Sequence, residues 1–236
     1  MTQRGDELAE RLAAVRRSVQ HACSQAGRDP AEVTLVAVSK TWPVSDIEAL
    51  ADLGVRDFGE NRAEELAAKT AALPAGELRW HFLGQIQSKK AVAIGRAAQA
   101  VHSVDRSKVV PGLARGAAEQ GWRLPAFVQV SLAGQAADAP TGRGGADPDE
   151  VLSVAAAIDA EPDLELAGVM TLPPRSLDPA AAFARLAQVA DQVRQRYPAA
   201  RAISAGMSHD FPAAIAAGAT HIRIGSAVFG ERQTVR

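Results

Sequence analysis

Lys40 is the residue of this chain whose type and position most clearly suggest chemistry. It follows an apolar, β-branched run, Val33 to Val38, that is typical of a strand covered on both faces in a parallel sheet. A lysine just beyond such a strand lies at its carboxyl end, where α/β folds bind their ligands. Partial desolvation lowers the pKa of an ammonium group, and the neutral amine can attack a carbonyl to form a Schiff base. A solvated surface lysine is the alternative, so this interpretation depends on the rest of the chain.

Two short loops near the carboxyl terminus have the residue types of an anion site. One is Ser204-Ala205-Gly206-Met207-Ser208, and the other is Gly225-Ser226. Glycine allows close backbone approach, and hydroxyl groups and helix N-termini bind anions. Ordinary turn chemistry explains either loop alone, but barrels often bind phosphate after strands seven and eight. Two such loops favour phosphate, and a Schiff-base lysine beside a phosphate site suggests pyridoxal 5′-phosphate (PLP).

Arg223 and Asn61 are the remaining polar candidates for this site. Arg223 lies in an apolar strand between Ile222 and Ile224, and a buried arginine is costly unless it is paired. Its partner is either a carboxylate elsewhere in the barrel or a ligand, at the pyridine nitrogen or near the phosphate. An arginine at that nitrogen would discourage its protonation and weaken the ring as an electron sink. Asn61 could bond a ring substituent, although asparagine after a strand is also a common turn residue.

The histidines give no sign of a metal site. His81, within a candidate strand, is predicted to be a hydrogen-bonded core histidine. We expect His21, His209 and His221 to be surface or helix-flanking residues, and His102 to come just before the end of another strand. Because no histidines and carboxylates show metal-site spacing, no metal is predicted.

The elements that position these residues alternate between strands and helices. An opening helix over Asp6–Gln25 carries an apolar stripe that ends at Cys23, predicted to be a core residue. Candidate strands are Val33–Val38, Val55–Phe58, Arg79–Leu83, Ala100–Val104, Ala126–Val130, Leu166–Met170, Arg201–Ser204 and His221–Ile224. Candidate helices are Ser45–Leu53, Arg62–Leu73, Ser88–Ala97, Lys108–Gln120, Pro148–Asp159, Pro179–Tyr197 and Phe211–Ala217.

This alternation predicts a single (β/α)8 barrel over residues 1–236 with an extra N-terminal helix. A doubly wound open sheet is the alternative, but Ser39-Lys40-Thr41-Trp42-Pro43 is not the glycine-rich fingerprint expected after its first strand. The segment Ala133–Ala146 is rich in glycine and alanine without periodicity, which predicts a mobile loop.

Composition limits the class of protein. The net charge of −1 and pI of about 6.5 do not favour nucleic acid or an anionic membrane. One cysteine excludes an intramolecular disulfide. No apolar stretch approaches the roughly 20 residues of a membrane span, and the charged N-terminus lacks a signal-peptide core. A cytoplasmic protein is expected.

Several motifs, in order along the chain, resemble the pyridoxal phosphate homeostasis proteins. They are VAVSKTWP, FGENRAEE, WHFLGQIQSKKA, HSVDR, GVMTLPP and SAGMSHDFPAAIAAGATHIRIGSAVFGER. The resemblance implies a barrel like the N-terminal domain of alanine racemase, of the fold type III group of PLP proteins. It implies that Lys40 is the PLP-linked lysine, and that Ser204, Gly206, Met207 and Ser208 form a loop near the phosphate. It also implies that Gly225 and Ser226 contact the phosphate and that Asn61 and Arg223 lie near the cofactor.

The chain departs from the family pattern in two places. The third block reads Gly84-Gln85-Ile86-Gln87, where the family commonly has Gly-His-Leu-Gln. The loop after the fifth strand lacks the usual Glu-x-x-Lys-x-Gly stretch. Neither change touches Lys40 or the phosphate loops.

The resemblance implies a PLP carrier without catalytic turnover, which transiently meets apo PLP-dependent enzymes and is expected to be a monomer. A PLP-dependent racemase or decarboxylase is the main alternative, but racemases of this fold draw an essential tyrosine from a second domain. The only tyrosine here, Tyr197, is predicted on the buried stripe of a helix. A Schiff-base aldolase that uses Lys40 without a cofactor and a scaffold that binds nothing are the remaining alternatives.

Overall fold

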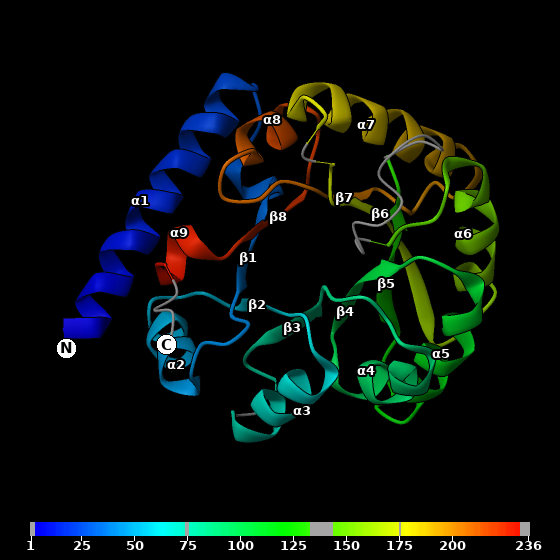
Figure 1. Cartoon of the computed structure of the whole chain (residues 1–236), viewed down its shortest axis with the longest axis horizontal. Coiled ribbons are helices and arrows are strands. Elements are labelled where there is room, and N and C mark those ends of the chain that lie inside the picture. Colours follow the sequence, from blue (N-terminus) through cyan, green and yellow to red (C-terminus); the bar gives the residue numbers. More distant parts are fainter. Residues whose placement is uncertain (1–2, 74–75, 133–143, 175, 232–236) are drawn as a thin grey trace.

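The computed structural model describes residues 3–73, 76–132, 144–174 and 176–231, and these contain eight strands closed into a parallel barrel (Figure 1). The strands follow chain order around the ring, and β8 closes it by pairing with β1. The predicted (β/α)8 barrel is confirmed. The strands are β1 (Thr34–Val38), β2 (Asp57–Glu60), β3 (Arg79–Phe82), β4 (Ala100–Val104), β5 (Leu124–Val130), β6 (Leu164–Thr171), β7 (Ala202–Ser204) and β8 (His221–Ile224).

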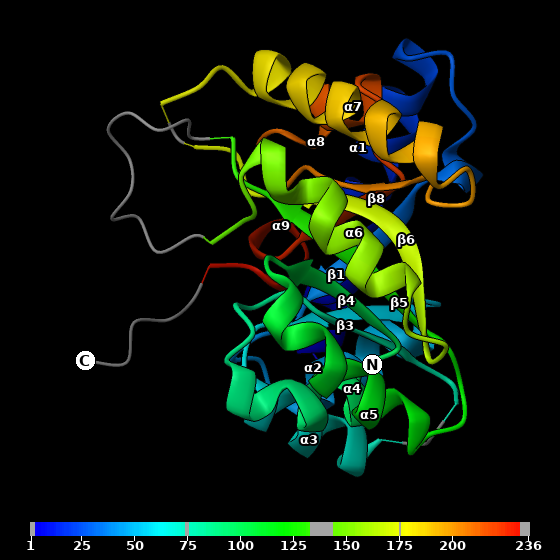
Figure 2. The ribbon, with the colours of Figure 1, turned by 90° about the vertical axis from the view of Figure 1, so that its right-hand side faces the viewer.

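Helices cover the outside of the barrel, as the two views show (Figures 1 and 2). The helices bury apolar residues in one continuous core that they share with the strands. The helices are α1 (Gln3–Gln25), α2 (Val44–Asp52), α3 (Ala63–Ala72), α4 (Ala91–Ala97), α5 (Val110–Ala118), α6 (Val151–Asp159), α7 (Pro179–Arg196), α8 (Phe211–Ala216) and α9 (Ser226–Phe229).

The predicted boundaries differ from the observed ones at helix starts and at strand ends. Short 3-10 turns at Ser88–Lys90, Ser107–Val109 and Pro148–Glu150 precede α4, α5 and α6, and the predicted helices included all or most of each turn. Strand β2 lies two residues later than predicted, and β5 and β6 begin two residues earlier. Helix α9 was not predicted, because four residues are too short to show periodicity.

The extra N-terminal helix packs beside α2, α8 and α9, on the side of the barrel where β8 meets β1 (Figure 1). Its stripe from Leu8 to Cys23 is buried, which confirms the core interpretation of Cys23. Near its start, Arg4 donates to Asp46 Oδ2 at 2.7 Å and to the Phe229 carbonyl at 2.8 Å. The Arg4 guanidinium also lies 4.9 Å from the centroid of the Trp42 ring, which stacks on Phe229. Through Arg4, helix α1 therefore contacts both α9 and the turn that follows β1.

Most of the predicted loop Ala133–Ala146 lies outside the described residues. Its last part is not a free loop, since Ala146 is buried and pairs with Val130 at the end of β5. The Ala146 N–H donates to the Gln129 carbonyl at 2.7 Å. Across the described segments, no helix is long and apolar enough to cross a membrane.

Candidate functional site

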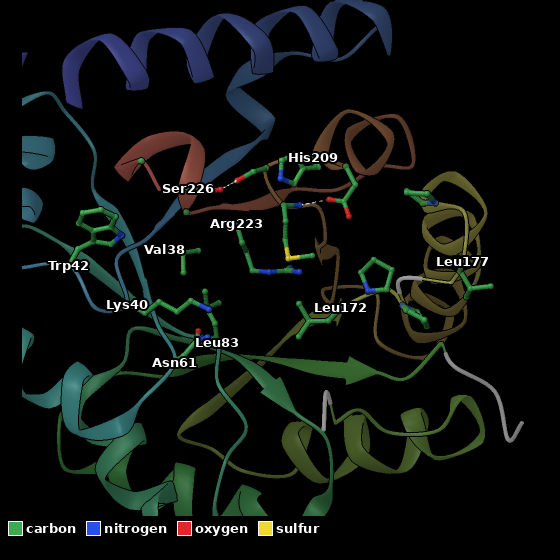
Figure 3. Close-up of a pocket in the computed structure, with 18 residues that line it drawn as sticks. Val38, Lys40, Trp42, Asn61, Leu83, Leu172, Leu177, His209, Arg223 and Ser226 are labelled. Carbon is green, nitrogen blue, oxygen red and sulfur yellow. Dashed lines mark hydrogen bonds between the residues drawn. The ribbon is translucent and has the colours of Figure 1, made fainter. Parts of the chain in front are cut away.

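A pocket of about 670 Å³ opens where the carboxyl ends of β1, β2, β3, β6, β7 and β8 meet (Figure 3). All of the predicted site residues except Ser204 and Gly206 line it: Lys40, Asn61, Met207, Ser208, Arg223, Gly225 and Ser226. Figure 3 shows Lys40 and Arg223 extending into the same space from β1 and β8, with Asn61 below Lys40. The barrel thus brings together residues that are far apart in the sequence.

The turn that carries Lys40 is held in an uncommon backbone conformation. Thr41 has a φ of 69°, a left-handed value that costs energy for a β-branched residue. The Thr41 N–H donates to Glu65 Oε1 at 2.5 Å, and the Ser39 N–H donates to the Gly59 carbonyl at 3.0 Å. These bonds from β2 and α3 fix the direction in which Lys40 leaves β1.

A buried ion cluster lies behind this turn. The Lys69 ammonium donates to Glu60 Oε1 at 2.7 Å, to Glu65 Oε1 at 2.8 Å and to the Ser39 carbonyl at 2.8 Å. The Ser39 hydroxyl donates to the same Glu60 oxygen at 2.7 Å. Burial raises the pKa of Glu60, while the hydrogen bonds from Lys69 and Ser39 oppose this rise. The other Glu60 oxygen is buried without a hydrogen-bond partner, so this carboxylate depends on Lys69.

Gly84 allows Asn61 to reach the pocket. A β-carbon at Gly84 would lie 1.9 Å from the Asn61 carbonyl oxygen, far inside the contact distance. The ends of β2 and β3 can therefore approach this closely only with glycine at the position. The close approach places Asn61 at the pocket wall beside Leu83.

The loop between β7 and α8 turns sharply into the pocket. Gly206 has a φ of 91°, and a β-carbon there would lie 2.8 Å from Phe211 Cα, so both backbone angle and space require glycine. The Asp210 carboxylate accepts the Met207 N–H at 2.5 Å, which turns one of its oxygens into the loop. Ser208 and Ser226 meet across the pocket edge with their hydroxyls 3.4 Å apart. Helix α9 begins at Ser226, so its first N–H groups have no partner within the helix.

Ser204 and Gly206 shape the site without lining it. The Ser204 hydroxyl is fully buried in the barrel, where it accepts from Arg223 Nη1 at 2.6 Å and lies 2.7 Å from His102 Nδ1. Arg223 Nη2 donates to the Thr171 carbonyl at 2.8 Å. A carboxylate partner for Arg223 was one expectation; the observed partners are instead a hydroxyl and a carbonyl. Burial lowers the pKa of Arg223 to about 10, an effect that Asp210 opposes.

The histidine predictions are partly wrong. His81 is buried and hydrogen-bonded, as predicted for a core histidine. His221, however, is not a surface residue. Its ring packs edge-on against Phe127 and His102 inside the barrel, and burial lowers its pKa to about 4. His221 begins β8, and side chains alternate in direction along a strand, so His221 and Arg223 share the inner face. This alternation was the signal that the sequence prediction overlooked.

Sequence reasoning also missed one wall of the pocket. The segment after β6 contributes an apolar wall of Leu172, Pro173, Pro174 and Leu177, and the loop after β7 adds His209 and Asp210. The position of these residues just after strands could have identified them, but prolines and leucines carry no chemical signature of a ligand. In the described part of the chain, no three His, Cys, Asp or Glu side chains are grouped to hold a metal.

The arrangement provides one amine, one guanidinium, two hydroxyls and a helix start around a single cavity. These are donor groups, and they suit a ligand that carries both an anionic group and a carbonyl. The Asp210 carboxylate is the acidic group among the residues that line the pocket, and one of its oxygens is already bonded to the loop. An anionic ligand therefore fits the donor set of this pocket.

Comparison with known proteins agrees with this geometry. The model of the family "Alanine racemase, N-terminal domain" matches residues 11–233. The pyridoxal phosphate homeostasis protein of Mycobacterium tuberculosis is 37% identical over 98% of this chain and 95% of that protein. The protein of the same name from Pseudomonas aeruginosa is 38% identical over 95% of this chain and 96% of its own length.

Solved structures show the same barrel. PipY of Synechococcus elongatus PCC7942, solved with PLP bound, is 34% identical with a TM-score of 0.79, over 94% of this chain and all of that chain (100%). The alanine racemase of Corynebacterium glutamicum is 18% identical, with a TM-score of 0.68 over 98% of this chain and 62% of its own, and shares the fold. By its near full-length similarity to several of its members, the chain belongs to the pyridoxal phosphate homeostasis protein family, whose barrel is the alanine racemase N-terminal domain.

Proposed function

We propose that this protein binds PLP through a Schiff base on Lys40 and carries or buffers it, in the service of intracellular PLP homeostasis. The observation that carries the proposal is the meeting of Lys40 with Ser208, Ser226 and the start of α9 in one pocket. An amine and an anion-binding edge are what a phosphorylated aldehyde requires. The bound PLP of PipY, a relative at 34% identity, supports the same ligand here.

The phosphate group is assigned to the edge made by the loops after β7 and β8. Ser208 and Ser226 offer hydroxyl donors, and the start of α9 favours a negative charge. Gly225 lines the pocket at this edge, and a β-carbon there would meet Val38 only at an ordinary contact distance of 3.6 Å. Met207 lies at the same edge, while Ser204 and Gly206 hold the loop in shape.

Lys40, Asn61 and Arg223 are assigned to the rest of the cofactor. PLP supplies, when bound, a reactive aldehyde and an electron-withdrawing ring. Lys40 provides the amine, and Asn61 provides hydrogen bonds for a ring substituent. Arg223 keeps its positive charge at neutral pH despite its lowered pKa of about 10. A guanidinium cannot accept a proton, so beside the ring nitrogen it discourages protonation there, which quiets carbanion chemistry and suits a carrier.

A role without catalytic turnover is part of the proposal. Racemase chemistry needs a second acid–base group opposite the lysine. The single tyrosine of the chain, Tyr197, follows the last turn of the 18-residue helix α7, whose first residue, Pro179, lines the pocket. A helix of that length spans about 27 Å, so Tyr197 lies at the far end from the pocket. Tyr197 is partly buried and packs against the core.

We further propose that residues 1–236 act as one PLP-binding domain and as a monomer in the cytoplasm. Its partners would then be PLP itself and, transiently, apo PLP-dependent enzymes, with no role in binding nucleic acid or membranes. The small net charge of −1 supports the absence of a nucleic-acid role.

Retention of PLP tests this proposal. The protein is incubated with PLP, desalted and examined by absorbance, together with Lys40→Ala and the control Lys89→Ala, which removes an exposed lysine elsewhere. The wild type and the control should retain PLP, and Lys40→Ala should lose the Schiff-base absorbance. Holo protein mixed with an apo PLP-dependent enzyme should restore that enzyme's activity, and racemisation of alanine by the holo protein alone would instead identify an enzyme.

A further inference from the structure

A line of buried polar groups continues from the pocket into the barrel. It starts at Arg223, which lines the pocket and donates to the Ser204 hydroxyl at 2.6 Å. The Ser204 hydroxyl lies 2.7 Å from Nδ1 of His102, and Nε2 of His102 lies 2.8 Å from Nδ1 of His81. His81 Nε2 then lies 2.9 Å from Asp57 Oδ1. Four consecutive hydrogen bonds thus connect the pocket with Asp57 through β8, β7, β4, β3 and β2.

The two ends of this line lie at opposite ends of the barrel. Asp57 and Arg79 are the first residues of β2 and β3, at the amino ends of the strands, whereas the pocket is at the carboxyl ends. Arg79 holds Asp57 with two hydrogen bonds of 2.7 and 2.6 Å, and its own side chain is 64% exposed. Between the ends, His81 is 4% exposed and His102 and Ser204 are fully buried. The line therefore joins solvent at one mouth to the cofactor pocket at the other.

The donors and acceptors along the line admit one arrangement when both histidines are neutral. A carboxylate can only accept, so His81 Nε2 carries a hydrogen and donates to Asp57. His81 Nδ1 is then an acceptor, which requires His102 Nε2 to carry the hydrogen. His102 Nδ1 must in turn accept from the Ser204 hydroxyl, whose oxygen accepts from Arg223. Every bond therefore points from Arg223 towards Asp57, and each group between them is satisfied on both sides.

Charges around the line favour this arrangement. Burial lowers the pKa of His102 well below its usual value, and the nearby His81, His221 and Arg223 lower it further, which keeps its ring neutral. Burial opposes ionisation of Asp57, but hydrogen bonds from His81 and Arg79 outweigh it and lower the pKa of Asp57 to about 2. A cation at one end and an anion at the other polarise the bonds between them in the same direction.

We propose that His102, His81 and Asp57 are positioning residues for Arg223, and that they form a hydrogen-bonded relay that couples the opposite mouth of the barrel to the cofactor pocket. This inference deepens the proposed function, on which it rests. The relay holds Arg223 by orienting the Ser204 hydroxyl oxygen towards it. The observed side-chain hydrogen bonds of Arg223 go to this oxygen and to the Thr171 carbonyl, so the Ser204 oxygen is one of the two groups that position the guanidinium.

A second proton on His81 would reverse the direction of the hydrogen bonds between His81, His102 and Ser204. A second proton on His81 would force Nδ1 to donate, so His102 would accept at Nε2 and donate from Nδ1. Ser204 would then receive hydrogens from both His102 and Arg223 and turn its own hydrogen away. The groups in contact with His81 are Asp57 on β2, His102 on β4 and His221 on β8, and Asp57 is also bonded to Arg79.

Nitrogen-15 NMR of the histidine rings tests the relay in the full chain without PLP. At neutral pH, His102 should be neutral with its hydrogen on Nε2, and Nε2 of His81 should carry a hydrogen. Ser204→Ala, which removes one oxygen, should shift the His102 resonances and leave those of the exposed His21 unchanged. A hydrogen on Nδ1 of neutral His102, or an imidazolium there at neutral pH, would overturn the proposed order of donors.

PLP retention tests the effect on Arg223. His102→Leu cuts the relay, whereas His102→Gln keeps an acceptor for Ser204 and a donor for His81. His221→Leu is the matched control, because this ring packs in the same cluster but bonds to Thr220 instead. We expect His102→Leu to weaken PLP binding by about tenfold, the loss of one hydrogen bond of about 1.4 kcal/mol. His102→Gln and His221→Leu should stay within about threefold of the wild type, which is less than one such bond.

Equal losses in His102→Leu and His221→Leu would show a packing effect and overturn the positioning role. Unchanged binding in His102→Leu would overturn it as well. If His102→Leu does not fold, Ser204→Ala cuts the same link and takes its place. A wild-type protein that fails to retain PLP would refute the proposed function, while the NMR result would still decide whether the relay exists.

Discussion

Replacing Lys69 by methionine tests whether the buried ion cluster holds the turn of Lys40. The Lys69 side chain is 7% exposed and donates to Glu60, Glu65 and the Ser39 carbonyl. Methionine preserves most of the volume but leaves the Glu60 carboxylate, which is fully buried, without its cation. Breaking a buried ion pair from one side costs about 3–5 kcal/mol, and packing of the methionine offsets part of this. We expect the free energy of unfolding at pH 7 to fall by about 3 kcal/mol.

The pH dependence of this loss follows from the Glu60 pKa. Burial already raises this pKa, and removal of Lys69 takes away a group that lowers it. Glu60 in the folded variant therefore binds a proton more readily than Glu60 in the unfolded chain. Stability from this group is present at low pH and lost as pH rises through the folded pKa. The deficit of Lys69→Met should accordingly shrink between pH 7 and pH 5.

Urea unfolding of the variant at both pH values measures these effects. Lys90→Met is the matched control, because the Lys90–Glu64 pair is exposed and screened by solvent, so its loss should change stability little. Adding Glu60→Gln to Lys69→Met should recover part of the loss, since a neutral amide needs no cation. A loss below about 1 kcal/mol for Lys69→Met, or a deficit that grows at pH 5, would refute the reasoning.

Three further predictions concern the pocket walls and the relay. Gly84→Ala places a β-carbon 1.9 Å from the Asn61 carbonyl oxygen, so it should cost about 2–3 kcal/mol in urea unfolding and weaken PLP retention; a neutral effect would contradict the close approach. Asp57→Asn should cost about 2 kcal/mol at pH 7, because the Asp57 pKa is lowered from 3.8 to about 2, and the difference from the wild type should vanish as acid titration passes from pH 4 to pH 2. Ser226→Glu places a negative charge at the phosphate edge and should weaken PLP binding more than tenfold, whereas Ser226→Thr should keep it; fluorescence titration compares the two.

Much of the barrel could be predicted from the sequence because its signals are local. The run Thr34–Val38 is rich in β-branched residues and is followed by a helical pattern, and the residues just after such a strand are expected at the mouth of the barrel. Lys40, Asn61 and Ser226 were predicted in this way, and the structure brings all three to one pocket. The four-residue helix α9 and the 3-10 turns carry no such signal.

The barrel interior could not be predicted from local pattern. The partners of Arg223 are set by which groups of β6 and β7 lie at the same height inside the barrel, and that depends on strand register. Ser204 illustrates the difficulty, since its place at a strand end suggested a phosphate contact, yet its hydroxyl turns inward to Arg223 and His102. Likewise, nothing near Lys40 in the sequence shows that Lys69 supports its turn.

Borohydride reduction after incubation with PLP, followed by peptide mass mapping, tests the central claim most directly. Reduction converts a Schiff base into a stable amine and so records which lysine formed it. We expect a phosphopyridoxyl group on the peptide that contains Lys40, and its loss in Lys40→Ala. Modification that is absent from Lys40, or that persists at the pocket in Lys40→Ala, would contradict the assignment of Lys40 as the PLP-binding lysine.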